Sequence, residues 1–196
     1  MRENDKKRIV IAITGASGAE YALATVSMLK RADCEIFCIA SDAAKDVALR
    51  ETECELAQSL ATAGAEKVYD ERDFDAPCAS GSFYFDAMAV VPCSMKTLGK
   101  IANSIADNLV VRAAEVALKE RRRLVVVPRE TPLAITHLKN MLELAQAGAV
   151  VLPACPAFYH NPKSAGDLVD FVAARVVSSM GIKQDFLKEW GYEKTV

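Results

Sequence analysis

Four short segments of the sequence carry residue types suited to binding a phosphorylated ligand. The first is Thr14-Gly15-Ala16-Ser17-Gly18, which follows an apolar run and precedes a segment with helical spacing. Glycines allow a tight turn, and the free N–H groups of a helix N-terminus attract an anion. The hydroxyls of Thr14 and Ser17 can add donors, so the segment predicts a phosphate site. A plain strand-to-helix turn fits equally, because the third glycine of dinucleotide-binding loops is missing.

The other three segments each begin with a proline directly after an apolar run. They are Pro92–Thr97, Pro128–Pro132 and Pro153–His160, and they contribute hydroxyls, cations and an aromatic ring. The carboxyl ends of parallel strands lie at one edge of a sheet, where ligands of such folds bind. The four segments together therefore predict one site at that edge.

The elements that would place these segments alternate between strands and helices. Apolar runs predict strands at 9–14, 35–40, 87–91, 124–127 and 149–152, with a short edge strand at 67–69. Helical spacing predicts helices at 19–30, 43–50, 54–63, 108–120, 136–147 and 164–180, the last opened by a capping box of Ser164 and Asp167. This alternation predicts an α/β fold with a doubly wound, three-layer parallel sheet. We expect a single domain over residues 1–196, with a core at 8–182 and a C-terminal tail at 183–196.

Composition narrows the classes of function. The chain has 196 residues, 52% of them apolar, and a formal net charge of −2, which argues against disorder and against a nucleic-acid surface. No apolar run reaches about 18 residues, and the first residues lack a signal-peptide core, so we expect no membrane span and a cytoplasmic location. The six cysteines form no Cys-x-x-Cys pair and the two histidines have no spaced partner, so we expect free thiols and no metal site.

Five longer motifs resemble a known family. In chain order they read Gly-Ala-Ser-Gly, Pro-Cys-Ser-Met-Lys-Thr-Leu, Leu-Lys-Glu-Arg-Arg, Pro-Arg-Glu-Thr-Pro-Leu and Pro-Ala-Phe-Tyr-His-x-Pro. From residue 8 to about 182 the sequence resembles the UbiX/Pad family of flavin prenyltransferases. The resemblance implies a Rossmann-like, flavodoxin-type fold that binds FMN. It also implies transfer, without metal, of a dimethylallyl group from dimethylallyl monophosphate to N5 and C6 of reduced FMN, which acts as a substrate.

The same resemblance implies partners and individual roles. The product would be the prenylated FMN that UbiD-type decarboxylases use, and the chain would form a homo-oligomer, by resemblance a dodecamer. The residues expected to contact FMN are Gly15, Ala16, Ser17, Ser41, Ser94, Met95, Lys96, Thr97 and Arg129. Those expected to bind the prenyl donor are Lys119, Arg129, Tyr159, Arg175 and Trp190. Those expected to act in catalysis are Ser17, Lys119, Glu130 and Tyr159.

These residue types suit the chemistry of an allylic phosphate. When the bond between carbon and the phosphate oxygen breaks, Lys119, Arg129 and Arg175 can offset the charge that grows on the leaving group. Aromatic faces, here Tyr159 and Trp190, can stabilise an allyl cation. A positioned carboxyl can relay protons near flavin N5, which is the expected role of the acidic residue after the arginine of Pro-Arg-Glu.

Several of these residues also have a structural explanation, which the sequence leaves open. Lys119 fits the solvated end of a helix, Glu130 fits a surface ion pair, and Trp190 fits packing of the tail. Cys93 lies where a nucleophile would, but no histidine pairs with it by pattern, so we interpret it as structural. His160 precedes an Asn-Pro turn, which favours packing of a loop over a role as a base.

Two other functions remain open. A flavin-dependent cysteine decarboxylase of the same superfamily would resemble this chain in fold, but such proteins use an early histidine, and none precedes His137 here. A non-catalytic flavin carrier is the second alternative, and a gain of one dimethylallyl unit on the flavin would separate the enzyme from the carrier. The downstream acid, the number of phosphates on the donor and the number of subunits also stay open.

Overall fold

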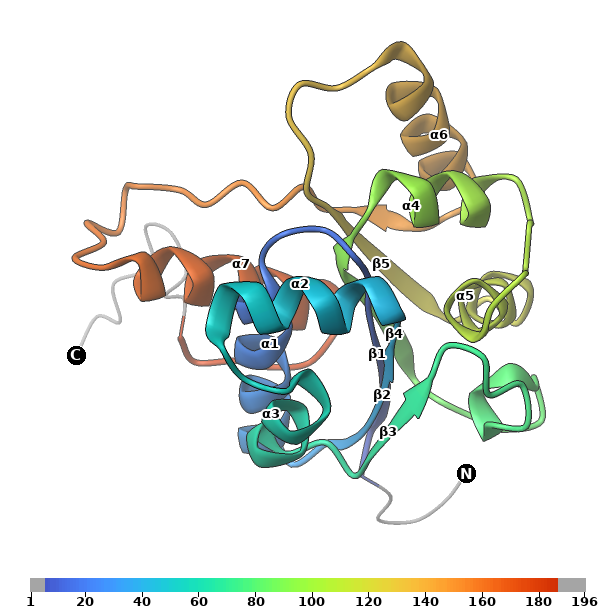
Figure 1. The fold of residues 1–196 in the computed structure, drawn as a ribbon, viewed down its shortest axis with the longest axis horizontal. Helices are drawn as coiled ribbons and strands as arrows, with labels where there is room; N and C mark the ends of the chain where they lie inside the picture. The colour runs from blue at the N-terminus through green and yellow to red at the C-terminus, as the bar shows by residue number, and fades with distance from the viewer. Residues whose placement is uncertain (1–5, 187–196) are drawn as a thin grey trace, which may run out of the picture.

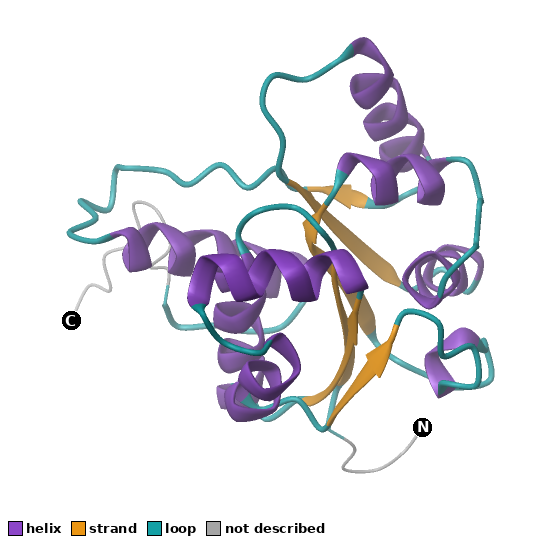
Figure 2. Ribbon diagram, viewed as in Figure 1, coloured by secondary structure: helices purple, strands orange, loops and turns teal. Residues whose placement is uncertain are grey.

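Six parallel strands form the central sheet, which we describe from a computed structural model that covers residues 6–186 (Figures 1 and 2). They run in the order β3-β2-β1-β4-β5-β6, and each neighbouring pair is parallel. This is the strand order of a Rossmann fold, so the predicted doubly wound parallel sheet is confirmed. The strands are β1 (Arg8–Ile13), β2 (Glu35–Ala40), β3 (Lys67–Asp70), β4 (Ala87–Cys93), β5 (Arg123–Pro128) and β6 (Val150–Val151).

Helices cover both faces of the sheet and give the three layers that the sequence predicts (Figure 2). None of the described helices is both long enough and apolar enough to cross a bilayer. One face carries α1 (Ala19–Arg31), α2 (Asp42–Thr52), α3 (Leu56–Ala63) and α7 (Ala165–Ser179). The other carries the 3₁₀ turn η1 (Pro77–Ala79), α4 (Met95–Ala102), α5 (Leu109–Lys119) and α6 (Ile135–Gln146).

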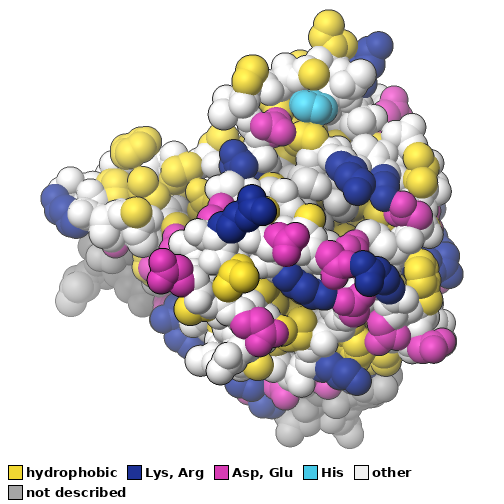
Figure 3. Space-filling view, viewed as in Figure 1, with side chains coloured by type: hydrophobic (Ala, Val, Ile, Leu, Met, Phe, Trp, Pro, Cys, Tyr) yellow, Lys and Arg dark blue, Asp and Glu magenta, His cyan; other side chains and the backbone are white. Residues whose placement is uncertain are grey.

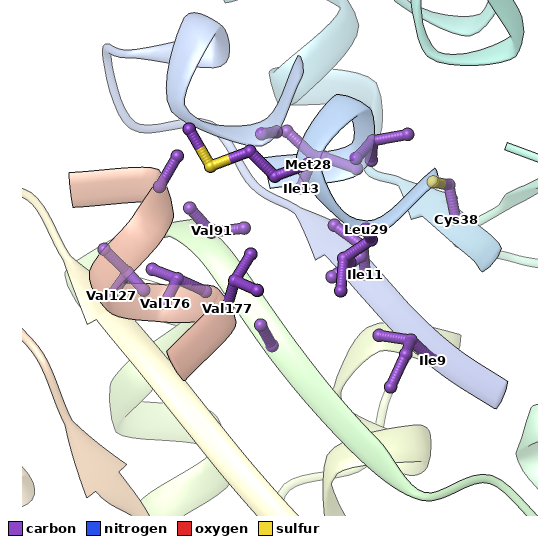
Figure 4. Packing of buried hydrophobic residues seen from close by; sticks show 14 of the residues in the cluster. Ile9, Ile11, Ile13, Met28, Leu29, Cys38, Val91, Val127, Val176 and Val177 are labelled. Carbon is purple, nitrogen blue, oxygen red and sulfur yellow. The ribbon is translucent and has the colours of Figure 1, made fainter. Parts of the chain in front are cut away.

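Two hydrophobic cores lie on opposite sides of the sheet because successive strand residues point to opposite faces. Ile9, Ile11 and Ile13 of β1 pack with α1 and α7, as Figure 4 shows. Val10 and Ala12, between them, join the core under α4 and α5. All five side chains are almost fully buried. Burial on both faces explains why the strand reads as one continuous apolar run.

The main difference from the predicted elements is α4, which the sequence analysis treated as a loop. Its start is visible in retrospect, because the Ser94 hydroxyl caps the helix by accepting the N–H of Thr97 at 3.3 Å. Leu98 and Ile101, three residues apart, then face the core. Pro92 does not end its strand as predicted, since β4 continues to Cys93. The last strand is shorter than predicted and the other boundaries shift by one or two residues.

Gly15 is required by the packing of the chain on itself. A Cβ atom at this position would lie 2.5 Å from the Cβ of Ala43, in the first turn of α2. The small residue therefore lets the loop after β1 lie directly against α2. This packing constraint adds to the tight turn that the sequence predicts at this glycine.

Replacing Gly15 by Ala should lower the free energy of unfolding by about 1–3 kcal/mol, the usual cost of overpacking. Adding Ala43→Gly in the same chain should recover most of that loss, because it removes the atom that clashes. Urea denaturation of the flavin-free protein measures both effects. A double variant whose loss equals the sum of the two single losses would show that this contact is not the constraint.

Candidate functional site

The hydroxyl of Thr14 joins the carboxyl ends of β1 and β4, the two strands between which the strand order reverses. It donates to the carbonyl of Pro92 at 2.9 Å and accepts the N–H of Ser94 at 2.7 Å. Thr14 is buried, and its own N–H also bonds the Pro92 carbonyl, at 3.2 Å. Its single hydroxyl proton is therefore committed within the protein, contrary to the expectation that it serves a ligand. The bond places the first turn of α4 beside the loop that contains Gly15.

A cavity of about 380 Å³ opens at this edge of the sheet. Its size lies in the range of small-molecule sites. It brings together five of the residues predicted to contact FMN: Gly15, Ser41, Ser94, Lys96 and Thr97. The other lining residues are Ala43, Glu71, Arg72, Lys100, Asp107 and Asn108.

The N-terminus of α4 makes the wall of this cavity suitable for an anion. The N–H groups of Met95 and Lys96 belong to the first turn, so they have no carbonyl partner within the helix. The positive end of the helix dipole adds to their attraction. Ser41 and Thr97 are buried residues that line the same cavity and carry hydroxyl groups. These groups fit a phosphate monoester such as that of FMN.

Glu51 occupies the other candidate anion site, the N-terminus of α1. Its carboxylate accepts the N–H of Gly18 at 3.0 Å and the N–H of Ala19 at 3.2 Å. These are the groups that the sequence analysis assigned to a bound phosphate. Sequence reasoning missed Glu51 because the contact joins residues 33 positions apart, which no local pattern reveals.

Arg129 and Ser17 complete a charged cluster around Glu51. Burial alone would raise the pKa of the Glu51 carboxyl. Hydrogen bonds from the Ser17 hydroxyl and from the N–H groups of Gly18 and Ala19, together with the charge of Arg129, outweigh burial and lower this pKa. The Nε of Arg129 is buried and has no hydrogen-bond partner among the described residues. A donor left in this state fits a site that is completed by an anionic ligand.

Tyr159 lies against α7, so the segment after β6 folds back over this helix. Its ring makes an edge contact with Phe171, with centroids 5.8 Å apart and planes at 84°. Arg175 is exposed one turn further along the same face of α7. Glu130 is also exposed, and its carboxylate accepts the N–H of Thr131 at 3.0 Å.

Lys119 lies at the opposite edge of the sheet within the chain. It ends α5, shortly before Arg123 begins β5 beside Ala87, the first residue of β4. A Cβ on Gly81 would lie 3.0 Å from the Lys119 Nζ, which bonds the carboxylate of Glu120. One copy of the chain therefore does not bring Lys119 to the cavity.

Three further expectations concern Trp190, Cys93 and the absence of a metal site. Trp190 lies outside the described residues. Burial raises the pKa of the Cys93 thiol to about 12, which suits the structural role that we assigned to it. Over residues 6–186, no three side chains among His, Cys, Asp and Glu form a cluster that could hold a metal ion.

A larger groove of about 720 Å³ lies between α1 and α3, away from the strand ends. It is lined by small, polar and acidic side chains, among them Glu53 and Glu55, and no lysine or arginine lines it. Two carboxylates without a cation repel a phosphate. The smaller cavity at the carboxyl edge is therefore the better candidate for the site.

Comparison with known proteins identifies close relatives. A family model described as Flavoprotein matches residues 1–177. The chain is 46% identical over 202 residues to flavin prenyltransferase UbiX of Pseudomonas aeruginosa, and the match covers 97% of each protein. The crystal structure of AnUbiX in complex with FMN and dimethylallyl pyrophosphate is similar with a TM-score of 0.91 and 42% identity, covering 96% of this chain and 100% of that one.

Two further structures extend the comparison. A dodecameric FMN-dependent UbiX-like decarboxylase from Escherichia coli O157:H7 has a TM-score of 0.86 and 41% identity, covering 90% of this chain and 96% of that one. The FMN-dependent cysteine decarboxylase TvaF from thioviridamide biosynthesis reaches a TM-score of 0.63 at 18% identity, covering 90% of this chain and 99% of that one. The second likeness shows a shared fold alone.

Replacing Glu51 by Gln should lower the free energy of unfolding at pH 7 by about 0.5–1 kcal/mol, a helix-cap value reduced for an exposed carboxylate. Because the folded-state pKa lies below the ordinary value of 4.5, the stabilisation is complete above that value and is lost as the pH falls through the folded-state pKa. Urea denaturation from pH 7 to pH 3 should therefore show the two proteins converging in acid.

The matched control is Glu53→Gln. Glu53 is the C-cap residue of α2, but it acts there through its backbone N–H, which bonds the carbonyl of Leu49, and not through its carboxylate. This control should leave stability at pH 7 unchanged. A Glu51→Gln protein as stable as the wild type at pH 7 would remove the capping role.

Proposed function

The chain belongs to the UbiX family of flavin prenyltransferases, and we propose that it transfers a dimethylallyl group from dimethylallyl monophosphate to N5 and C6 of reduced FMN. In this proposal FMN is a substrate as well as a bound flavin. The product is a prenylated FMN that a UbiD-type decarboxylase receives, and the reaction takes place in the cytoplasm.

The observation that carries the proposal is the presence of two separate anion sites at one edge of the sheet. One is the N-terminus of α4 with the buried hydroxyls of Ser41 and Thr97. The other lies toward Arg129, whose buried Nε lacks a partner among the described residues. A flavin phosphate and a prenyl phosphate are two anions that must bind together, so two sites are the number that the reaction needs.

Ser41, Ser94 and Thr97 would hold the FMN phosphate at α4. A single helix N-terminus suits one phosphate and favours FMN over FAD, whose pyrophosphate needs a longer glycine-rich loop. When bound and reduced, the flavin supplies the nucleophilic nitrogen that accepts the prenyl group. The protein contributes mainly orientation and charge.

The leaving phosphate would lie against Arg129, Tyr159 and Arg175. Guanidinium groups bind two phosphate oxygens at once and offset the charge that grows as the allylic bond breaks. The Tyr159 ring offers an aromatic face to the positive allyl group. Its contact with Phe171 places this ring one turn from Arg175, which supports a shared donor site.

Proton movement would involve Ser17 and Glu130. The Ser17 hydroxyl helps to lower the pKa of the Glu51 carboxyl, so Glu51 keeps its charge beside Ser17. The exposed Glu130 follows Arg129 directly and can exchange a proton with solvent.

The alternatives lose support from these findings. Identity with cysteine decarboxylases is low enough to reflect the fold alone, whereas identity with flavin prenyltransferases exceeds 40% along nearly the whole chain. A carrier that only delivers flavin would have no use for a second anion site. The buried, unpartnered Nε of Arg129 therefore favours an enzyme.

Lys119 fits this proposal only if a second copy of the chain supplies it, because it lies at the opposite edge within one copy. An apolar surface suggests where copies meet. Ile135, Leu138 and Leu142 of α6 are 73%, 51% and 57% exposed. Figure 3 shows hydrophobic side chains at the tip that α6 forms. Exposed apolar patches of this kind mark contact surfaces, so we propose a homo-oligomer, by analogy with the dodecameric relative.

Incubation of the purified protein with reduced FMN and dimethylallyl monophosphate should increase the mass of the flavin by one dimethylallyl group. Arg175→Lys should keep FMN affinity while raising the KM for the donor, because lysine cannot copy the two-pronged contact of arginine. Mass spectrometry and steady-state kinetics provide the measurements. An unchanged flavin in the wild type would favour the carrier, and loss of FMN binding in Arg175→Lys would refute the assignment of Arg175 to the donor.

A mixed oligomer should reveal whether Lys119 acts across subunits. Co-expression of Lys119→Ala chains with Arg129→Ala chains should restore about one quarter of wild-type activity, because that share of sites draws both intact residues from different copies. Co-expression of Ser17→Ala with Arg129→Ala is the control. Both of those residues belong to one edge of one chain, so that mixture should recover nothing. Inactivity of both mixtures would show that Lys119 is needed in the same copy as Arg129, and recovery of about one half would place Lys119 outside the site.

A further inference from the structure

Three aromatic rings pack together where the segment after β6 meets α7. His160 stacks on Phe171, with ring centroids 5.2 Å apart and planes only 9° from parallel. Tyr159 stands edge-on to both rings, at 5.8 Å and 81° from His160 and at 5.8 Å and 84° from Phe171. Phe171 is buried in the core beneath α7, so the platform itself is fixed.

The imidazole of His160 contacts Tyr159 and Phe171 through its ring, and it makes no hydrogen bond within the described part of the chain. Both of its nitrogen atoms are buried there without a partner. The polar contacts that anchor the same segment are made by its neighbours instead. The Asp167 carboxylate accepts the N–H of Lys163 and, at 3.2 Å, the N–H of Ser164, whose hydroxyl accepts the N–H of Asp167 in return.

We propose that His160 is a positioning residue, whose flat ring, stacked on Phe171, holds Tyr159 in the orientation that receives the prenyl donor. The inference rests on the proposed function, since it takes Tyr159 as a donor-binding residue. The Tyr159 ring is in contact with both other rings, and these contacts restrict how it can rotate. An aliphatic or amide side chain at position 160 removes one of them.

Two substitutions distinguish a ring from a hydrogen-bonding group. His160→Phe keeps a flat ring and removes both nitrogens, whereas His160→Asn keeps polarity and removes the ring. Binding of dimethylallyl monophosphate is measured by calorimetry on protein loaded with oxidised FMN, which does not consume the donor. One edge contact corresponds to an expected loss of donor affinity of about three- to tenfold in His160→Asn. His160→Phe should stay within about twofold of the wild type.

FMN affinity should be unchanged in both variants, which separates this role from general damage to the fold. His137→Asn, at the other histidine of the chain, is the matched control and should change neither affinity. Cleavage by chymotrypsin after Phe158 and Tyr159 is a readout without ligand. Mass spectrometry of the fragments separates these cuts from the new site that phenylalanine creates at position 160. Cleavage after Phe158 and Tyr159 should be faster in His160→Asn and unchanged in His160→Phe.

The opposite pattern, with Asn tolerated and Phe damaging, would show that the imidazole acts through hydrogen bonds and would overturn the inference. Equal loss of FMN and donor affinity in His160→Asn would reduce His160 to a structural residue. Failure of the wild type to bind the donor would refute the proposed function itself. In that case the cleavage rates still decide whether the stacked ring holds Tyr159 in place.

Discussion

The hydrogen bonds of the Thr14 hydroxyl hold together the two strands on which the site depends. β1 and β4 are neighbours in the sheet, yet their following loops leave in opposite directions, one toward α1 and the other toward α4. Thr14 ties these loops by accepting the N–H of Ser94 and donating to the carbonyl of Pro92. The loops that lead to α1 and to α4 are therefore fixed relative to each other. The cavity forms between the first turn of α4 and the loop held close to α2 by Gly15.

The N-termini of α1 and α4 lie at the same edge of the sheet, and both would attract anions. At α1 a side chain of the protein itself takes the place of the anion. The Glu51 carboxylate accepts the N–H groups at the start of α1. The Ser17 hydroxyl and the positive charge of Arg129 help to lower the pKa of this carboxyl. The start of α4 has no such internal carboxylate on its N–H groups among the described contacts. The N-terminus of α1 is therefore satisfied within the chain, whereas the N-terminus of α4 can accept a phosphate.

The segment between β6 and α7 depends on packing and on a capped helix start. The capping box of Ser164 and Asp167 fixes where α7 begins. Phe171, about two turns later, provides the surface on which His160 and Tyr159 rest. At the other end of the sheet, Lys119 belongs to a surface that a single copy leaves away from the cavity. The exposed apolar side chains of α6 are a second feature that one copy leaves unpartnered.

The sequence by itself determined the alternation of strands and helices, because burial on both faces of a parallel sheet imposes unbroken apolar runs such as Ile9–Ile13. It also determined that polar side chains gather at the carboxyl edge, since Ser41, Ser94 and Thr97 each follow such a run and line one cavity there. Tertiary structure alone decided which residues meet there. Glu51 reaches Gly18 across 33 positions, Thr14 bonds a carbonyl 78 positions away, and Lys119 is carried to the far edge by the direction of α5. Contacts of this kind depend on how whole elements pack, which short-range spacing does not encode.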